Sequence, residues 1–414
     1  MTRRLRACLL LLCSIVLLSI VYNVFYFTKK PPRMLQMTHL RQELIREITW
    51  GNTSFVFNAD EHKQEGINTI IVRGITGNTE AIVRKSSIPG QFQVLKEIGD
   101  QLTFCDHVLT STPWKPNPLN LAEFRMKLMN KTKSTFQDGF VLTHHNTRVG
   151  NTLPYTVDNY NLGSKTKFFN VTEGFFAENV SPNSPLSGKQ FKRCSVVGNS
   201  GTLSNSSCGK EIDQSDYVIR MNLPILRPHM ADAGWKTNLT TMNPTLVTRR
   251  FNGLKTKEGI DEYLNIIADF YGVLWLPCIT ATRTQDMCLK SKQTLDDYGV
   301  RNPESTIANP FHFDALLDFW KERTIKQFLT SGFYMTHLAL TMCEETHLYG
   351  FWPFLYRVPD RVTDTGTNTL RKVKYHYFDE IGSSKAHSIS DEFAVLLQMH
   401  VLGLLKLHVG DCDV

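Results

Sequence analysis

Signatures of a catalytic metal centre are missing from this sequence. There is no His-Glu-x-x-His motif, and the single Asp-x-Asp, at residues 411–413, surrounds Cys412 near the end of the chain. Protein-bound zinc and magnesium rely on such groups of histidine or carboxylate ligands. The adjacent His144 and His145 remain as candidate ligands, but two neighbouring histidines are more often a polar surface pair. The sequence therefore predicts no metal site.

Internal repeats and low-complexity tracts are missing as well, which excludes a repeat array or a compositionally biased chain. The 414 residues are 42% hydrophobic and 21% charged. This composition is sufficient for one globular domain of about 300 residues with a large core. The net charge of +7 is modest for the length and spread along the chain, so it suits acidic ligands without requiring them.

A long hydrophobic run lies near the N-terminus. Residues 7–28 contain no charged side chain, and about twenty such residues suffice to cross a bilayer. The run ends in the bulky residues 25–27 instead of the small residues that suit cleavage, which favours an uncleaved signal anchor over a cleaved signal peptide. We therefore expect a cytoplasmic tail, a transmembrane anchor, a lumenal stem and a globular domain at residues 1–6, 7–28, 29–100 and 101–414.

N-glycosylation sequons indicate the orientation of the anchor, whose flanking charges are too balanced to do so. Six sequons follow it, at Asn52, Asn130, Asn170, Asn179, Asn205 and Asn238. They place the rest of the chain in the secretory lumen, away from nucleic acid. Cysteines can pair in that oxidising compartment. Seven of the nine follow the anchor, so at least one is free or pairs between chains, as in a homodimer.

A turn containing two glycines follows the first of two short apolar runs in residues 194–222. Residues 195–197 have the composition of a buried strand, which stops at Gly198-Asn199-Ser200-Gly201, and residues 216–222 indicate a second strand. In open α/β sheets, nucleotides bind at the carboxyl ends of parallel strands. The turn lacks the third glycine of a dinucleotide fingerprint, so a purely structural turn is an equally good interpretation.

A second group of candidate residues is Thr330-Ser331-Gly332, ahead of the apolar run 333–343. The absence of Gly and Pro from this run predicts a helix with a Ser/Thr cap. Its exposed N–H groups and positive dipole end would face an anion such as a nucleotide phosphate, although an ordinary capped core helix fits the same pattern. A strand at 347–351 then leads to Trp352, which either flanks a base or sugar or belongs to the core.

Two histidines form a third group of candidates. His376 lies within the aromatic segment 375–379, and His387 precedes a segment whose apolar spacing over 393–404 predicts a helix facing the core. A helix N-terminus disfavours the imidazolium, so the neutral His387 ring would be able to accept a proton.

The residues after His387 fit the start of that helix. Ser388 and Asp391 have the spacing of a capping box. Glu392 falls in the first turn, where it would hold the neighbouring loop or orient the imidazole, with an exposed first-turn glutamate as the alternative.

These segments, with this order and placement of cysteines, resemble the animal sialyltransferases of glycosyltransferase family 29, most closely the α2,8-sialyltransferase branch. The resemblance covers about residues 100–414. Phe378 stands where the family's third motif usually has tyrosine. The segments similar to the large, small, third and His-x4-Glu motifs are 194–244, 330–352, 376–379 and 387–392.

The resemblance implies roles for individual residues. His387 would be the catalytic base, and His376 would stabilise the phosphate. The positions that match donor-binding residues are Asn199, Asn222, Thr330, Ser331, Gly332, Trp352, Tyr375 and His376.

The resemblance also implies a fold and disulfides. The fold would be a single α/β domain with a Rossmann-like sheet sandwiched by helices, a metal-independent variant of the GT-A type. The implied disulfides are Cys194–Cys343 and Cys208–Cys412. Cys278 and Cys288 are a further candidate pair, which would leave Cys105 alone.

The implied activity is inverting transfer of sialic acid from CMP-sialic acid to a sialylated glycan on a glycolipid or glycoprotein. The enzyme would be a single-pass type II protein of the Golgi membrane. The leaving CMP carries one phosphate, so hydrogen bonds and a nearby positive charge or dipole can assist its departure without a metal or other cofactor.

Three alternatives stay open. Polysialyltransferases of the branch carry a strongly basic tract before the large motif, whereas residues 162–193 have a net charge of only +3, which favours addition of one or a few sialic acids. A non-catalytic lumenal glycan-binding protein would not need both histidines together with the 330–332 segment. A metal-dependent transferase for another nucleotide sugar would usually need an acidic ligand pair.

Overall fold

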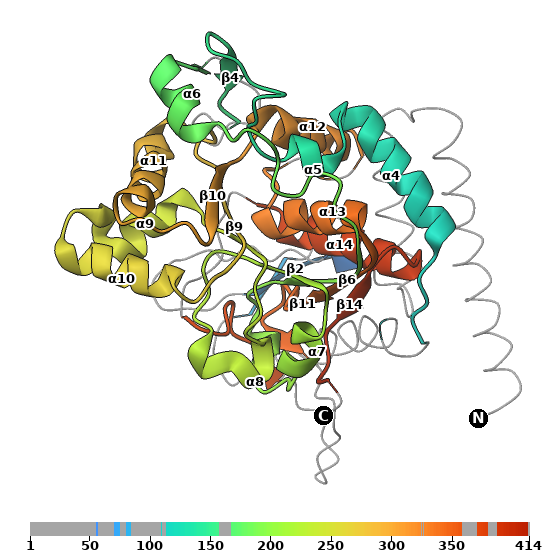
Figure 1. Cartoon of the computed structure of the whole chain (residues 1–414). Coiled ribbons are helices and arrows are strands. Elements are labelled where there is room, and N and C mark those ends of the chain that lie inside the picture. The colour runs from blue at the N-terminus through green and yellow to red at the C-terminus, as the bar shows by residue number, and fades with distance from the viewer. Residues whose placement is uncertain are drawn as a thin grey trace, which may run out of the picture. The chain divides into compact units, whose positions relative to one another are not determined.

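The computed structural model describes residues 109, 113–156, 167–323, 325, 327–357, 371–379 and 387–412, with the backbone of three short strands nearer the N-terminus (Figure 1). The chain divides into two compact units, Met1–Glu97 and Ile98–Val414. In the first, β1 (Phe55–Val56), β2 (Ile70–Gly74) and β3 (Glu80–Val83) form an antiparallel sheet.

Several expected features fall outside these residues. They are the cytoplasmic tail, the anchor at 7–28, most of the stem at 29–100, Asn52 and Cys105. Within the described part of the chain, no helix combines the length and the apolar character needed to cross a membrane.

The second unit alternates helices and strands. Its helices are α4 (Pro118–Thr132), α5 (Phe136–Gly139), α6 (Glu173–Asn179), α7 (Gly209–Asp213), α8 (Met230–Ala233), α9 (Pro244–Phe251), α10 (Lys257–Ile267), α11 (Thr282–Asp297), α12 (Pro310–Lys321), α13 (Ser331–Met342) and α14 (Ile389–Val401). Its strands are β4 (Thr152–Pro154), β5 (Phe168–Asn170), β6 (Phe191–Val197), β7 (Tyr217–Arg220), β8 (Leu239–Thr241), β9 (Val273–Leu276), β10 (Glu304–Ile307), β11 (Cys343–Tyr349), β12 (Tyr356–Arg357), β13 (Arg371–Lys372) and β14 (Lys406–His408).

Seven of these strands form one parallel sheet in the order β10-β9-β8-β7-β6-β11-β14. From β6 the chain adds strands in one direction as far as β10, and it then returns to add β11 and β14 on the other side of β6. The direction therefore reverses between β6 and β11. In open α/β sheets, ligands bind outside the carboxyl ends of the strands at such a reversal.

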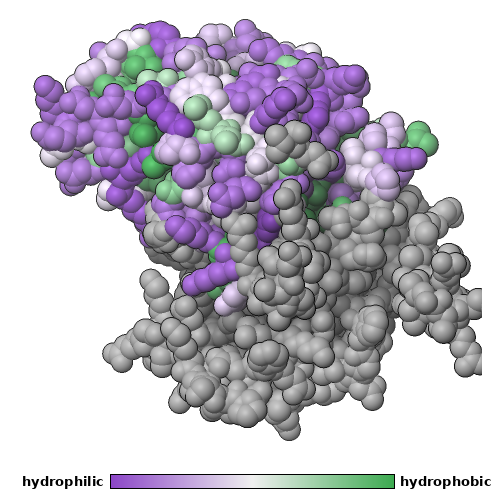
Figure 2. Space-filling model, turned by 90° about the horizontal axis from the view of Figure 1, so that it is seen from below, coloured by the Kyte–Doolittle hydropathy of each residue, from purple (hydrophilic) through white to green (hydrophobic). Residues whose placement is uncertain are grey.

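Helices cover both faces of the sheet. Successive residues of a strand point to opposite sides, so each face carries buried apolar side chains that pack against a layer of helices. Val196, Ile219 and Trp275 belong to a core shared with α4, α12, α13 and α14. Leu274 packs in a second core with α9, α10 and α11, and Val218 in a third with α7 and α8 (Figure 1). The expected sheet between helix layers is confirmed. On the face in Figure 2, the described surface is mainly hydrophilic, with apolar residues in separate patches.

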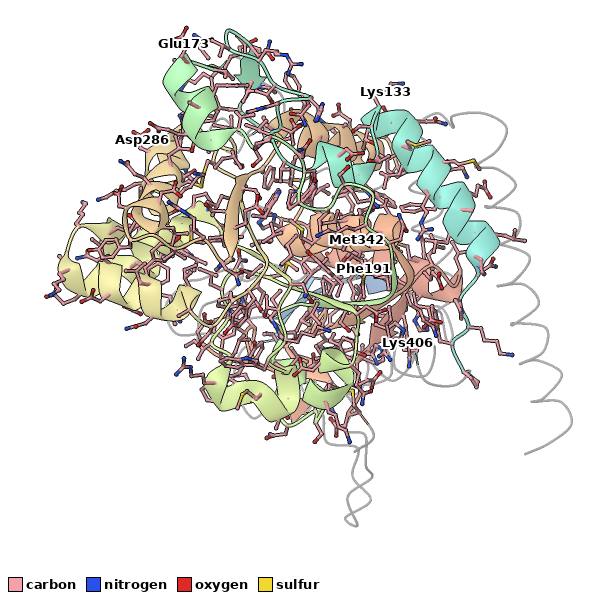
Figure 3. All side chains as sticks on the ribbon, viewed as in Figure 1. Lys133, Glu173, Phe191, Asp286, Met342 and Lys406 are labelled. Atoms are coloured by element: carbon pink, nitrogen blue, oxygen red, sulfur yellow. A yellow bond between two sulfur atoms is a disulfide. The ribbon has the colours of Figure 1, made fainter. Side chains whose placement is uncertain are left out.

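Among the described residues there are three disulfides, the expected pairs Cys194–Cys343, Cys208–Cys412 and Cys278–Cys288. The first joins β6 to the beginning of β11, and the second joins the residue before α7 to the C-terminal segment. The third joins the segment after β9 to α11. Figure 3 labels Phe191 and Met342 next to each other, where β6 begins and α13 leads into β11, while Lys406 lies apart from them because β14 begins beside His347, farther along β11. The first disulfide thus fixes the two strands that flank the reversal.

The sequons differ in accessibility. Asn130, Asn170 and Asn205 are exposed, and Asn179 is half-buried. Asn238 instead accepts the backbone N–H of Val218 through its side-chain oxygen at 2.9 Å, and the threonine of its sequon is buried in β8. The folded chain therefore presents three of its described sequons fully.

Candidate active site

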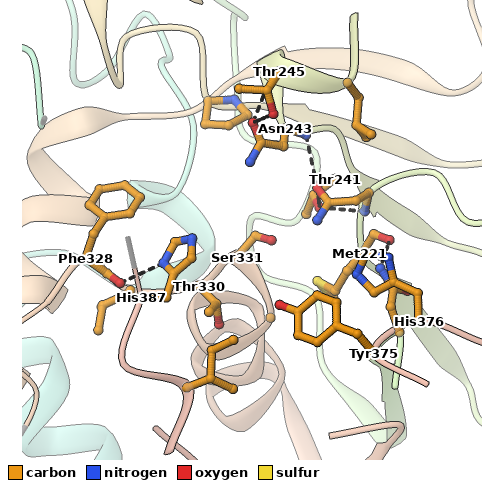
Figure 4. Close-up of a pocket in the computed structure, with 18 of the residues that line it drawn as sticks. Met221, Thr241, Asn243, Thr245, Phe328, Thr330, Ser331, Tyr375, His376 and His387 are labelled. Atoms are coloured by element: carbon orange, nitrogen blue, oxygen red, sulfur yellow. Dashed lines mark hydrogen bonds between the residues drawn. The ribbon is translucent and has the colours of Figure 1, made fainter. Parts of the chain in front are cut away.

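A cavity of about 580 Å³ lies where β6, β7, β8, β9 and β11 end (Figure 4). Segments far apart in the sequence meet there, including the beginnings of α13 and α14. Every residue that the resemblance assigned to the donor or to catalysis lines it: Asn199, Asn222, Thr330, Ser331, Gly332, Trp352, Tyr375, His376 and His387. The structure therefore brings together all the predicted site residues, whose individual roles remain predictions.

The glycines of the first loop serve packing between backbone segments. A Cβ at Gly198 would lie 2.5 Å from the carbonyl oxygen of Gly350, and one at Gly201 would lie 2.6 Å from that of Lys374. Only glycine allows the loop after β6 to approach those two segments so closely. The structural interpretation therefore holds for the glycines, while Asn199 between them lines the cavity.

The two asparagines are held by the strand ends. The Asn199 amide donates to the backbone oxygen of Met221 at 3.1 Å, and its own oxygen is buried without a partner among the described residues. Such an orphaned acceptor favours a ligand that brings an N–H or O–H donor. Asn222 adopts a left-handed conformation with φ of 62°, and its oxygen accepts the backbone N–H of Asn243 at 3.0 Å. Its position just after β7 shortens the strand predicted at 216–222.

Helix α13 begins as the sequence predicts. Thr330 is its N-cap, and the threonine hydroxyl accepts the backbone N–H of Phe333 at 3.0 Å. In Figure 4, Ser331 points from the first turn into the cavity. A ligand there would meet free backbone N–H groups and the positive end of the helix dipole, an environment suited to an anion.

Glu392 holds this helix start. Its carboxyl group accepts the backbone N–H of Thr330 at 2.7 Å and the threonine hydroxyl at 2.6 Å. Burial raises the pKa of Glu392 to about 8, and the nearby charge of Asp391 contributes in the same direction. Of the three expectations for Glu392, holding the loop is the one the structure shows, and the exposed glutamate is wrong because the side chain is buried.

We expect Glu392→Gln to remove a pH dependence of stability. With a folded pKa of about 8 and an ordinary value of 4.5, the folded state binds the extra proton between these values, so the wild type loses stability as pH rises through that window. The loss amounts to about 1.4 kcal/mol per pH unit at most. Glutamine does not titrate and avoids this loss, because its oxygen can still accept the N–H of Thr330 while its NH2 group donates to the threonine hydroxyl oxygen. Urea unfolding at pH 5.5 and 7.5 measures the free energies. Parallel changes in the two proteins would contradict the assignment, and Glu392→Ala should be less stable than the glutamine variant at both pH values.

The predicted capping box at α14 is wrong. The Ser388 hydroxyl donates to the carboxylate of Asp391 at 2.6 Å and forms no side-chain bond to a backbone N–H of the helix. The carboxylate offers a charge-assisted bond that the serine uses instead of capping. The helix itself is present and begins at Ile389, four residues before the expected apolar periodicity.

His387 has a defined tautomer. Its Nδ1 lies 2.8 Å from the backbone oxygen of Phe328. Because a carbonyl oxygen only accepts, Nδ1 carries the hydrogen and the Nε2 lone pair is left to take a proton. Burial lowers the pKa of His387, partly opposed by the bond to Phe328. The predicted neutral imidazole is therefore supported, with burial as the largest cause.

His376 lies across Ser331 from His387 in Figure 4. Its Nδ1 is 2.7 Å from a carboxylate oxygen of Asp379, and Phe378 stacks on the ring with centroids 5.3 Å apart. The carboxylate fixes the orientation of the ring. Phe378, in place of the usual tyrosine, supplies the stacking surface. Tyr375 lines the cavity beside His376. Burial raises the pKa of the Tyr375 hydroxyl, which therefore keeps its proton and can donate a hydrogen bond to a ligand.

Trp352 belongs to the core and also lines the cavity, while its predicted contact with a base or sugar stays a prediction. It lines the cavity, yet only 7% of its surface is exposed, and its indole N–H donates to the backbone oxygen of Tyr356 at 2.9 Å. Its ring packs edge to face on Phe354 and Phe393. It therefore presents one edge to the cavity as part of the core.

The residues that the sequence offered as metal ligands make other contacts in the structure. His144 stacks on Phe176, His145 bonds to Asn183 at 2.9 Å, and Asp411 pairs with Arg357 at 3.1 Å. Within the described ranges, one group of potential ligands comes close together, Glu211, His408 and Cys412. It does not fit a cation, since Cys412 is disulfide-bonded and Glu211 already pairs with a guanidinium.

Sequence reasoning missed the wall formed by α9 and α11. Thr241, Asn243, Thr245, Arg249 and Arg283 line the cavity from this side. The available signal was the position of α11 after the apolar run at 273–276, which forms β9, whereas the segment before α9, Leu-Thr-Thr at 239–241 in β8, has no such run. Residues at the carboxyl ends of such strands are candidates for ligand contacts.

A cavity at the reversal of a parallel α/β sheet, lined by an open helix start and a neutral histidine, defines a nucleotide-binding enzyme architecture. The family model of glycosyltransferase family 29 (sialyltransferase) matches residues 141–404. The chain belongs to this family of sialyltransferases. It accordingly uses CMP-sialic acid as donor and glycans as acceptors.

Curated relatives match most of the chain. The alpha-N-acetylneuraminide alpha-2,8-sialyltransferase of Xenopus laevis is 34% identical over 277 residues, 66% of this chain and 71% of that protein. The human alpha-2,8-sialyltransferase 8F is 31% identical over 311 residues, 74% of this chain and 72% of that protein. A solved mammalian sialyltransferase is 19% identical with a TM-score of 0.45, and the match covers 68% of this chain and 94% of that structure.

Proposed function

We propose that this enzyme adds sialic acid in α2,8 linkage to a glycan that already ends in sialic acid. The printed names of the relatives support the linkage. The observation that carries the chemistry is the presence in one cavity of the Nε2 of His387 and the open start of α13. A proton acceptor and an anion site on two sides of one space are what a displacement at a sugar phosphate needs.

In the proposed reaction, the acceptor hydroxyl oxygen attacks the anomeric carbon of the donor sialic acid while the bond to the CMP phosphate oxygen breaks. The hydroxyl proton passes to Nε2 of His387, whose Nδ1–H stays on the carbonyl of Phe328. The phosphate takes the electron pair of the broken bond. The N–H groups at Ser331, the hydroxyl of Tyr375 and the His376 ring supported by Asp379 surround the place for its charge. Attack from the face opposite CMP inverts the anomeric carbon.

The product of the wild-type enzyme tests this function. The full-length protein would be incubated with CMP-sialic acid and matched glycolipid or glycoprotein glycans that end in sialic acid or in galactose. We expect the mass of one or a few sialic acids to be added to the sialylated acceptor alone, and α2,8-specific sialidase to remove it. Addition to the galactose-terminated glycan would contradict the proposal. Binding of CMP without turnover would favour the non-catalytic alternative.

We further propose that no metal or other cofactor takes part. CMP leaves with a single phosphate, so the donors of α13 and the supported His376 suit its charge. Transfer rates should therefore be the same with and without EDTA. A loss in EDTA that magnesium or manganese restores would favour the metal-dependent alternative.

Short products are proposed over polysialic acid. Of the basic residues in the tract 162–193, Arg193 is used within the fold, where its guanidinium bonds to Glu211 at 2.8 Å and to the hydroxyl of Tyr349 at 2.9 Å. The tract therefore offers a growing polyanion even less charge than its net +3 indicates. Mass spectra with chains of tens of sialic acids would contradict this.

The location follows from the sequence and is proposed on that ground. An uncleaved anchor at residues 7–28, exposed sequons and three disulfides suit a type II protein with its enzyme domain in the Golgi lumen. A homodimer remains a proposal that light scattering of the purified protein would test.

A further inference from the structure

Two arginines stand on the wall formed by α9 and α11. Arg249 is on α9 and Arg283 is the second residue of α11, and both are exposed and line the cavity. Thr245 and Arg249 are four residues apart on α9, so one face of this helix looks into the cavity. The cavity therefore has a cationic wall in addition to the donor residues.

The order of the strands separates this wall from the donor residues. Asn199, Asn222 and Trp352 follow β6, β7 and β11, the strands at the reversal. Helix α9 follows β8 and α11 follows β9, the next two strands along the sheet. Neighbouring strands are about 5 Å apart, so the arginine wall begins roughly one sugar width beyond the donor loops.

His387 is held on the same side of the cavity as the α9–α11 wall. Its carbonyl partner belongs to Phe328, whose ring stacks on Phe313 with centroids 4.9 Å apart. Phe313 lies on α12, which follows β10 at the end of the sheet beyond β9. A base must contact the acceptor, so the acceptor belongs between His387 and the α9–α11 wall.

Three further charged residues line the cavity, and each has a contact within the protein. Asp379 bonds to His376 at 2.7 Å, and Glu392 bonds to Thr330. Arg250 donates to the backbone oxygen of Leu223 at 2.8 Å and lies 3.9 Å from Glu262. Among the described arginines that line the cavity, Arg249 and Arg283 are exposed, whereas Arg250 is half-buried.

The wall is anchored to the sheet. The disulfide Cys278–Cys288 joins the segment after β9 to the second turn of α11, and the hydroxyl of Thr280 donates to the backbone oxygen of Pro277 at 2.7 Å. These two contacts hold the loop between β9 and α11, and with it the backbone at the start of α11 that carries Arg283. An arginine on a fixed helix start binds a carboxylate at lower entropic cost than one on a mobile loop.

We propose that Arg249 and Arg283 bind the carboxylate of the terminal sialic acid of the acceptor, and so select sialylated over neutral glycans. This inference rests on the proposed α2,8 function, in which the acceptor sugar itself carries a carboxylate. Guanidinium groups suit this anion because they donate charge-assisted and often bidentate hydrogen bonds.

The test uses the full-length enzyme with Arg249→Gln, Arg283→Gln and both substitutions. Arg301→Gln is the matched control, since Arg301 is an exposed arginine that follows α11 and does not line the cavity. The acceptors are one sialylated glycan and the same glycan with its carboxylate converted to the neutral amide. KM is measured for each acceptor and for CMP-sialic acid, with CMP release in the absence of acceptor as a readout of the donor site.

With the sialylated acceptor, we expect the double variant to raise the acceptor KM at least tenfold, while the KM for CMP-sialic acid and acceptor-free CMP release stay unchanged. The amide should be a poor acceptor for the wild type, and the substitutions should not weaken it further. Arg301→Gln should behave like the wild type. Melting temperatures of all variants would show that they fold.

Three results would overturn the inference alone, with wild-type transfer intact. They are an unchanged acceptor KM in the double variant, a raised KM for the donor instead, or an amide used as well as the carboxylate. If the wild type transfers no sialic acid to a sialylated glycan, the proposed function fails first, and this inference fails with it.

Discussion

His387→Ala should lower kcat for sialic acid transfer by about 10²- to 10⁴-fold, the usual contribution of a positioned general base. The Nε2 of His387 is the basic atom, because Nδ1 donates to the carbonyl of Phe328. Alanine removes that atom but none of the groups on α13 or at His376 that are proposed to bind the donor. CMP affinity, measured by calorimetry, should therefore stay close to that of the wild type. Retention of near-normal transfer by a folded variant would show that His387 is not the base.

The pH profile of the wild type gives a second test of the same residue. Burial lowers the pKa of His387 below its ordinary value of 6.5, so the ring is neutral and able to accept a proton at pH 6.5 and above. As pH falls through the lowered pKa, protonation removes the base, and kcat/KM should fall with it. The residual activity of His387→Ala should lack this acid limb. His145→Ala is the matched control, since His145 is exposed and bonds only to Asn183 in the described structure.

Replacing both Cys194 and Cys343 by alanine should lower the free energy of unfolding by about 5 kcal/mol. In the chain-entropy model, a crosslink stabilises more when it closes a longer loop, and this one joins residues 149 apart. The loss is a large part of the 5–15 kcal/mol that is usual for a whole domain. Urea unfolding of the purified enzyme measures it, with the yield of secreted protein as a second readout if the variant does not fold.

The matched control is the short disulfide. Cys278 and Cys288 are only 10 residues apart, so their replacement by alanine should cost about 3 kcal/mol in the same model. Removing the short crosslink should chiefly disturb the wall at α11, whereas removing the long one takes away the covalent link between β6 and β11 and leaves their hydrogen-bonded pairing. Equal losses for the two pairs would contradict the dependence on loop length.

Local sequence patterns, namely cap residues and apolar runs, predicted the helices and strands in which such patterns occur. The cap and apolar run at Thr330 gave α13, and the apolar residues 195–197 gave the end of β6. The disulfides Cys194–Cys343 and Cys208–Cys412 and the set of site residues came from the resemblance, whereas Cys278–Cys288 was only a further candidate pair. Strand order was not predictable, because hydrophobic periodicity identifies a strand without naming its neighbour.

The failures have physical reasons. The spacing of Ser388 and Asp391 fits a capping box equally well whether the serine bonds to a backbone N–H or, as here, to the carboxylate. Nothing local to Glu392 showed that it would be buried against Thr330, 62 residues away. Arg249 and Arg283 carry no motif at all, since only the order of strands brings them to one cavity.

The bond between Glu392 and Thr330 makes α13 and α14 one unit. His387, two residues before α14, and the first turn of α13 at Ser331 are therefore expected to shift together if either helix moves. Changes in acceptor choice, by contrast, need only new side chains on α9 and α11. Related enzymes can then diversify in the glycans they extend while the parts that cleave the sugar nucleotide stay as they are.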